Sequence, residues 1–182
     1  MLPHGTPLNQ NCWVVPDLET AMRRWIAMGV GPFYHFAFSF PDADYRGRTV
    51  PLAFKVALAQ AGPMQIELIE QTSPGPSCYR DVVPEGQTGF HHVCKITDDY
   101  ARDVAALKAR GIVIANAFIS SGNIPACYAD TREEIGCMFE LVPDVPILRA
   151  MGRMVADGAI GWDGTDPIRV GSDHIAPYLQ PA

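Results

Sequence analysis

Four side chains that can bind a divalent metal ion occupy equivalent places in the two halves of this sequence. Gln10 and His92 lie in the strand-like runs QNCWVV and GFHHVCKI, and Glu67 and Glu140 lie in later runs of the form apolar-Glu-Leu-apolar. Imidazole and oxygen ligands together suit zinc, nickel, cobalt, manganese or iron better than calcium. The two carboxylates would balance the charge of one such ion, which could polarise a substrate carbonyl. The sequence therefore predicts one site for a divalent metal ion.

The elements that must position these residues also occur twice. In each half an aspartate, Asp17 or Asp99, stands seven residues after the first candidate ligand and twelve residues before a glycine. Aspartate favours the start of a helix and glycine its end, so each interval predicts a helix. Three strand-like runs follow each helix, and the last of them carries the glutamate. The chain thus predicts two β-α-β-β-β modules, over about residues 8–71 and 89–143.

The other segments connect and extend these modules. Residues 72–88 form a connection rich in proline and glycine, and residues 144–182 begin as a helix and continue as a tail. A chain of 182 residues is long enough for one domain of ordinary size, so we expect a single α+β domain over 1–182. The tail should pack on a surface because it carries several large apolar residues: Trp162, Ile168, Ile175, Tyr178 and Leu179.

Composition excludes several classes of protein. The formal net charge is −6, and no basic stripe is present to neutralise phosphates, so no nucleic-acid partner is expected. No apolar run is long enough to span a membrane, and the first residues do not read as a signal peptide. The five cysteines form no CxxC pair, which favours reduced thiols. We expect a cytoplasmic protein that binds a small-molecule substrate.

The two modules, the GFHHV strand and the paired Glu-Leu strands resemble the vicinal oxygen chelate superfamily over about residues 8–143. That superfamily includes glyoxalase I, methylmalonyl-CoA epimerase, ring-cleaving dioxygenases and bleomycin-resistance proteins. The resemblance implies a cupped, barrel-like sheet, metal ligands on the first and last strand of each module, and a homodimer. The ligands it implies are Gln10, Glu67, His92 and Glu140, the set found in glyoxalase I of the human type. Epimerase-like members usually have histidine at the first of these positions.

The resemblance also implies roles in catalysis. A ligand glutamate that leaves the metal, as in glyoxalase I, would be the proton-transfer base, with Glu140 as the first candidate and Glu67 as the second. Lys55 stands where the epimerases carry a catalytic carboxylate, so their two-base mechanism is not expected. A cation there would pair with a substrate carboxylate or an enolate oxygen, or would simply reach solvent. His91 should point to the opposite face from His92, because neighbouring strand residues alternate.

Three functions remain open from the sequence. The first is a metal-dependent isomerase or lyase that acts on an α-hydroxy-carbonyl or acyl-thioester substrate. The second is a non-catalytic protein that holds a small molecule in the cup between the modules. The third is a ring-cleaving dioxygenase, a class that resembles this fold but typically uses two histidines and one glutamate. Gln10 and the additional Glu67 therefore argue against the third function.

Overall fold

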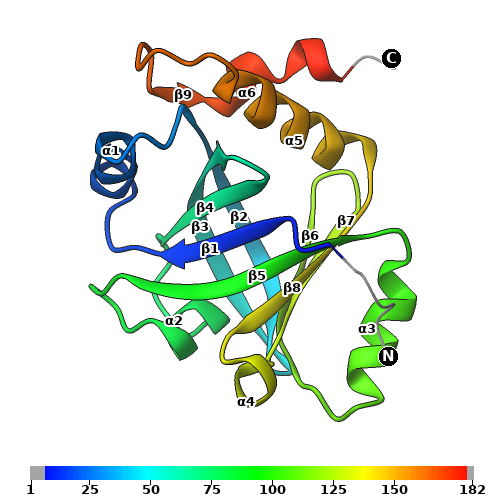
Figure 1. Ribbon diagram of the computed structural model, residues 1–182. Coiled ribbons are helices and arrows are strands. Elements are labelled where there is room, and N and C mark those ends of the chain that lie inside the picture. Colours follow the sequence, from blue (N-terminus) through cyan, green and yellow to red (C-terminus); the bar gives the residue numbers. More distant parts are fainter. Residues whose placement is uncertain (1–6, 180–182) are drawn as a thin grey trace.

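The computed structural model describes residues 7–179, and both halves of the chain fold as a strand, a helix and three further strands (Figure 1). The first half contains β1 (Gln10–Val14), α1 (Leu18–Ala27), β2 (Phe33–Tyr45), β3 (Arg48–Ala61) and β4 (Met64–Gln71). The second half contains β5 (Gly89–Thr97), α3 (Tyr100–Lys108), β6 (Ile114–Ser120), β7 (Ile124–Ala129) and β8 (Met138–Pro143). The prediction of two β-α-β-β-β modules is therefore confirmed.

The same local chemistry starts and ends the two equivalent helices. The Asp17 carboxylate accepts a hydrogen bond from the backbone N–H of Thr20 at 2.7 Å, and the Asp99 carboxylate accepts one from Arg102 N–H at 3.0 Å. These contacts satisfy backbone donors that have no partner within the helix. Gly29 and Gly111 follow the helices with φ of 89° and 79°, a conformation that favours glycine.

The strands close into a barrel in the order β3-β4-β1-β5-β8-β7-β6-β2, and β2 pairs back onto β3. The two modules join along β1 and β5, which run antiparallel. They meet a second time where β2 and β6 pair, but only at Asp44 with Ala117 and Tyr45 with Asn116. The mixed α+β class and the curved sheet agree with the prediction.

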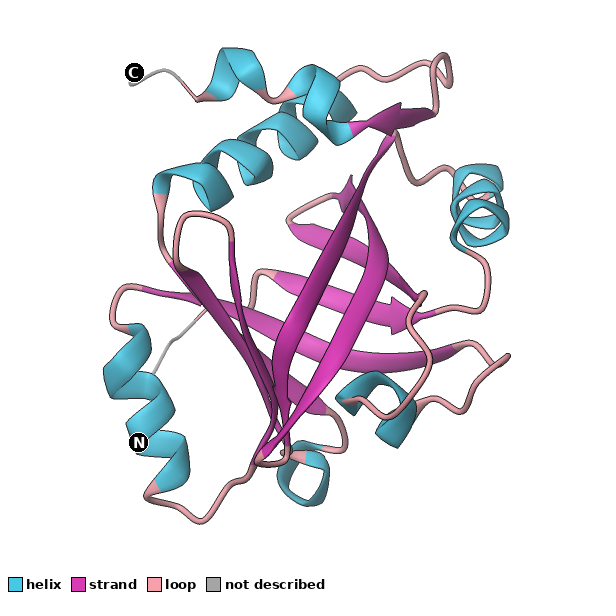
Figure 2. Cartoon of the chain, turned by 180° about the vertical axis from the view of Figure 1, so that it is seen from behind, coloured by secondary structure: helices cyan, strands magenta, loops and turns pink. Residues whose placement is uncertain are grey.

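Beyond that short contact, β2 and β6 separate and leave a split in the barrel wall. Figure 2 shows the strands diverging from one end of the barrel toward the other. Helix α5 (Pro146–Ala159) lies at the wide end (Figure 1), where Met154 and Val155 are buried in the interior cluster. The apolar interior is thus bounded by the barrel wall and α5.

Several short elements were not expected from the sequence. Strand β2 continues through the polar run PDADY and turns at Arg46 and Gly47, both of which have positive φ. A register shift between Phe40 and Ala43 accompanies this extension. The connection 72–88 contains α2 (Cys78–Val82), and a second short helix, α4 (Arg132–Ile135), precedes β8. Helices this short give too few residues for a periodic pattern.

The tail packs on the chain's own barrel. Strand β9 (Ile168–Val170) pairs in parallel with Phe33–His35 of β2, and α6 (Gly171–His174) and a 3-10 turn, η1 (Ala176–Tyr178), follow it. Ile175 and Tyr178 pack against the interior cluster. The expectation that this segment covers a surface is confirmed for the residues described, which exclude 180–182. No helix among the described residues is long and apolar enough to cross a membrane.

Candidate metal centre

The four candidate ligands come from neighbouring strands. Gln10 lies on β1, Glu67 on β4, His92 on β5 and Glu140 on β8, and these strands are consecutive in the order β4-β1-β5-β8. Each side chain is buried, and Gln10, Glu67 and Glu140 line a cavity of about 1230 Å³ inside the barrel. The structure therefore brings all four residues to one region of the barrel interior.

The backbone register explains this convergence. Cys12 of β1 is paired with Glu67 on one side and with His92 on the other. In the next row, Cys94 of β5 lies between Gln10 and Glu140. Residues two apart in a strand share a face, so both rows point to the same side of the sheet. The two rows form a pseudo-symmetric set in which each module contributes two candidate ligands.

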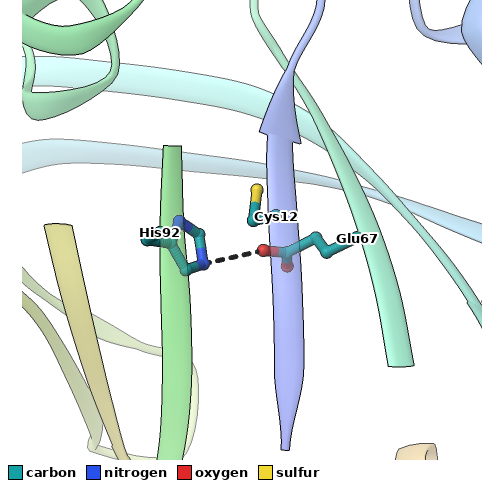
Figure 3. Close-up of side chains that lie close together, drawn as sticks. All are labelled: Cys12, Glu67 and His92. Carbon is teal, nitrogen blue, oxygen red and sulfur yellow. Dashed lines mark ion pairs between the residues drawn. The ribbon is translucent and has the colours of Figure 1, made fainter. Parts of the chain in front are cut away.

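The side-chain distances are those of a compact site. His92 Nε2 lies 3.1 Å from Glu67 Oε2 and 3.2 Å from Glu140 Oε2 (Figure 3 shows the first of these contacts). The Gln10 amide donates from Nε2 to Gln65 Oε1 at 2.9 Å. That hydrogen bond fixes the orientation of the amide and leaves Gln10 Oε1 as the atom that can bind a metal.

A β-bulge turns two adjacent histidines toward each other. Between Cys12 and Trp13 the register shifts, so Cys12 lies opposite His92 whereas Trp13 lies opposite Phe90. His91 is the extra residue, and its Nδ1 lies 2.8 Å from Nδ1 of His92. The expectation that His91 points to the opposite face was wrong, because a bulge breaks the alternation of side chains and re-aims them.

The contact of His91 with the backbone determines which nitrogen of His92 carries a proton. His91 Nε2 lies 3.0 Å from the carbonyl oxygen of Cys78, which can only accept, so the N–H must be at Nε2. Burial lowers the pKa of His91 well below its ordinary value, so the ring is neutral and its Nδ1 is an acceptor. His92 therefore donates from Nδ1 to His91, and its Nε2 is the nitrogen that faces the two glutamates, as an N–H when the ring is protonated and as a lone pair when a metal ion takes the place of that proton.

This arrangement needs a positive charge. Among the described residues, Glu67 Oε2 and His92 Nε2 are buried side-chain atoms with no hydrogen-bond partner. Burial alone would lower the pKa of His92, but the charge of Glu140 and the contacts with both glutamates raise that pKa to about 9. Burial also raises the pKa of Glu67. A proton or a metal ion between these atoms would remove the repulsion, and the donor set fits a divalent metal.

Cys12 belongs to the same group, although it was not among the ligands expected from the sequence. Ligand atoms of Cys12, Glu67 and His92 all lie within 4.8 Å of one another (Figure 3). Burial and the neighbouring Glu67 raise the pKa of the Cys12 thiol well above its ordinary value. The residue is therefore a protonated thiol beside the glutamate. Its position two residues after Gln10, on the same strand face, was the signal that could have identified it.

Lys55 does not reach this site. Its Nζ lies 3.2 Å from Glu70 Oε1, and its side chain is 50% exposed. Phe54 and Val56 on either side of it line the cavity, so alternation along β3 directs Lys55 to the outer face. Glu70 also accepts a hydrogen bond from the first residue of α1, Leu18. The role in the site that was considered for Lys55 is therefore corrected: the residue pairs with Glu70 outside the barrel.

Comparison with known proteins identifies the family. Residues 9–128 match the model of a family described as the Glyoxalase/Bleomycin resistance protein/Dioxygenase superfamily, and the matched segment includes Gln10, Glu67 and His92 but ends before Glu140. No curated protein sequence matches the chain significantly.

Solved structures with a similar fold include two epimerases. Methylmalonyl-CoA epimerase from Mycobacterium tuberculosis has a TM-score of 0.53 at 16% identity, over 82% of this chain and 97% of its own. Methylmalonyl-CoA epimerase from Streptomyces coelicolor, in complex with 2-nitronate-propionyl-CoA, has a TM-score of 0.51 at 17% identity, over 76% and 96%. A hypothetical protein from Bacillus halodurans C-125 has a TM-score of 0.53 at 15% identity, over 78% and 96%. At these identities the likeness concerns the fold. With the family match over more than half of its length, the chain belongs to the glyoxalase/bleomycin resistance/dioxygenase superfamily, the vicinal oxygen chelate fold.

Proposed function

We propose that this protein is a metal-dependent isomerase or lyase that transfers a proton next to the carbonyl group of a small molecule. The observation that carries the proposal is a buried cluster in which His92 Nε2 lies 3.1 Å from Glu67 Oε2 and 3.2 Å from Glu140 Oε2, while Glu67 Oε2 and His92 Nε2 have no hydrogen-bond partner within residues 7–179 outside this cluster. Burying such groups is costly unless a cation compensates them.

Gln10, Glu67, His92 and Glu140 would hold one divalent ion, of zinc, nickel, cobalt, manganese or iron. When bound, that ion would supply the positive charge that polarises a carbonyl. His92 would bind through Nε2, because its Nδ1 donates to His91. The two glutamates would neutralise the charge of a divalent ion. The site as a whole would then carry no net charge that repels the reacting oxygen of the substrate.

Glu140 is our first candidate for the base that removes the proton, and Glu67 is the second. Both carboxylates are buried and yet line the cavity, so a bound molecule can reach them. A carboxylate released from a cation into an apolar cavity becomes a stronger base, since desolvation raises its pKa. The epimerase fold neighbours support this reaction class, because epimerisation is a proton transfer.

The size of the cavity favours one alternative function, that of a protein that binds a small molecule without changing it. The cavity volume of about 1230 Å³ exceeds the usual range of ligand pockets, roughly 300–1,000 Å³. A ring-cleaving dioxygenase is the weaker alternative, because the site offers one histidine, two glutamates and a glutamine rather than two histidines and one glutamate. Turnover separates the enzyme from the binding protein.

The test compares His92→Ala and Glu140→Gln for metal content and turnover. His92→Ala should lose the metal, because it removes a ligand from the centre of the site. Glu140→Gln should keep part of the metal and lose isomerase or lyase activity on α-hydroxy-ketone substrates. Glu70→Gln is the matched control, since it is the same change on the outer face of β4. Full metal occupancy in His92→Ala would mean that the ligand set is wrong.

We also propose that the protein is a cytoplasmic homodimer, as members of this superfamily often form dimers. The tail no longer supports a dimer, because it packs within the chain. Exposed apolar side chains elsewhere, such as Met28 at 81% and Ile160 at 79%, remain available for a subunit contact.

A further inference from the structure

The cavity carries an aromatic cluster that bridges the split in the barrel. Phe118 of β6 stacks on Phe40 of β2 with ring centroids 4.2 Å apart and an interplanar angle of 26°. Phe38 and Phe54 complete the cluster, with centroids 5.7 Å apart. All four rings line the cavity, and Phe38 and Phe118 are only partly buried. Their remaining ring surface is available for stacking with a ligand.

Aliphatic side chains from β3, β5 and α5 continue this surface. Val56 and Leu58 of β3 lie between the aromatic cluster and Glu67, since Leu58 is paired with Glu67 across the sheet. Ile96 of β5 and Leu148 and Met151 of α5 close the other sides. The path from the split to the candidate metal centre is therefore lined mainly by apolar side chains.

The charged groups that line the cavity are all acidic. Asp42 and Asp44 lie on β2 near the split, and Glu67 and Glu140 lie at the candidate metal centre. Among the residues that the structure describes, no lysine, arginine or histidine side chain lines this cavity. The segments outside the description, MLPHGT and QPA, contain no lysine or arginine. A carboxylate or phosphate inside the cavity would find no protein cation to pair with, and burying it unpaired is costly.

We infer that the cavity takes an uncharged molecule of more than one aromatic ring, and that it rejects anionic ligands of the same size. The inference deepens the proposed function, on which it rests for the reacting carbonyl: the substrate would be an uncharged aromatic hydroxy-ketone rather than an anionic acyl thioester. The preference for a neutral over an anionic ring system follows from the lining alone and does not require the metal.

The test is calorimetric titration of the full chain with two probes that share one ring system. At pH 7, 1-naphthol is neutral and 1-naphthoate carries a negative charge. In the metal-free protein, 1-naphthol should bind at least about tenfold more tightly than 1-naphthoate, because the naphthoate charge would be buried without a cation to pair with. Phe118→Ala should weaken 1-naphthol binding by about fivefold to tenfold, since it removes one stacking ring.

A paired charge insertion distinguishes the lining from general repulsion by an acidic protein. Gln60 lines the cavity next to Leu58 on the same strand face, so Gln60→Lys should raise the affinity for 1-naphthoate by at least about fivefold. Thr49→Lys adds the same charge to an exposed position of β3 that does not line the cavity, and should leave that affinity unchanged.

Tighter binding of 1-naphthoate than of 1-naphthol to the metal-free protein would overturn the inference, and so would the absence of binding by both probes. Loss of metal binding with the probe preference intact would refute the proposed function and leave this inference standing. Equal gains from Gln60→Lys and Thr49→Lys would show that overall charge, and not the cavity, sets the preference.

Discussion

His91 offers a sharp test of how the site is held, because it contacts a candidate ligand and is not one itself. Its ring accepts from His92 Nδ1 at 2.8 Å and donates to the Cys78 carbonyl at 3.0 Å. Replacement of His91 by phenylalanine keeps a ring between Tyr79 and Tyr128 but removes both hydrogen bonds. Replacement by glutamine keeps an amide that can donate to the carbonyl and accept from His92.

The expected magnitude follows from these contacts. Loss of a hydrogen-bond partner that orients a metal-binding histidine typically costs about 10–100-fold in metal affinity. The same change leaves the His92 N–H buried without a partner, which costs about 1–3 kcal/mol in the free energy of unfolding, whereas the Cys78 carbonyl belongs to α2 and keeps its bond within that helix. His91→Phe should therefore lose zinc affinity by about 10–100-fold and should unfold at a lower urea concentration, whereas His91→Gln should recover most of both.

Zinc affinity can be measured by competition with a chromophoric chelator, and stability by urea unfolding of the metal-free proteins. His35→Phe is the matched control, because His35 lies on β2 outside the candidate metal centre. Equal zinc affinity in wild type and His91→Phe would refute the tautomer argument. A loss in His91→Gln as large as that in His91→Phe would show that the imidazole matters for a reason other than these two hydrogen bonds.

Three further predictions concern stability and assembly. Burial alone would raise the pKa of Asp103, but hydrogen bonds from Lys95 and Thr97 lower it to about 2. The ionised Asp103 therefore stabilises the fold above its ordinary pKa of about 3.9, and this stabilisation is lost as the pH falls through about 2. Between about pH 4.5 and about pH 2, the free energy of unfolding measured in urea should fall by about 2 kcal/mol more for wild type than for Asp103→Asn. Leu68 is fully buried between the sheet and α1, so Leu68→Ala should cost about 2–5 kcal/mol in urea unfolding, whereas Leu8→Ala at an exposed position should cost little. A homodimer should sediment at twice the chain mass of 19.9 kDa, and a species of 19.9 kDa at micromolar concentration would contradict it.

The fold could be predicted from the sequence because its strongest local signals occur twice. Asp17 and Asp99 cap their helices by accepting a hydrogen bond from the backbone N–H three residues later in the chain. Such short-range contacts can be recognised directly from the sequence. The closure of β2 onto β6 could not be predicted, since it rests on pairing at Asp44 and Tyr45, within a segment whose turn residues suggested a loop. Long-range pairing of this kind has no local signal.

Part of the candidate site was predictable because its two glutamates occupy equivalent places in the two modules. Glu67 and Glu140 are charged residues inside apolar strands, and such positions require a partner. The position of His91 depended on a bulge, and a bulge is a property of the pairing between two strands rather than of either strand. The sequence left Lys55 with two alternatives, the site or the solvent, because its face of β3 depends on strand pairing, and the structure places it on the outer face beside Glu70.

The two junctions between the modules give the barrel two different walls. Around the closed order of strands, the β1–β5 junction and the β6–β2 junction lie opposite each other. The first is hydrogen-bonded along the whole of β1 and carries the candidate ligands on β4, β1, β5 and β8, so their backbones are held in fixed register. The second pairs only at Asp44 and Tyr45, and its edges supply Phe40 and Phe118 to the cavity. A metal site needs ligands held to within a fraction of an ångström, which the fully paired junction provides, whereas the other junction supplies aromatic rings to the cavity.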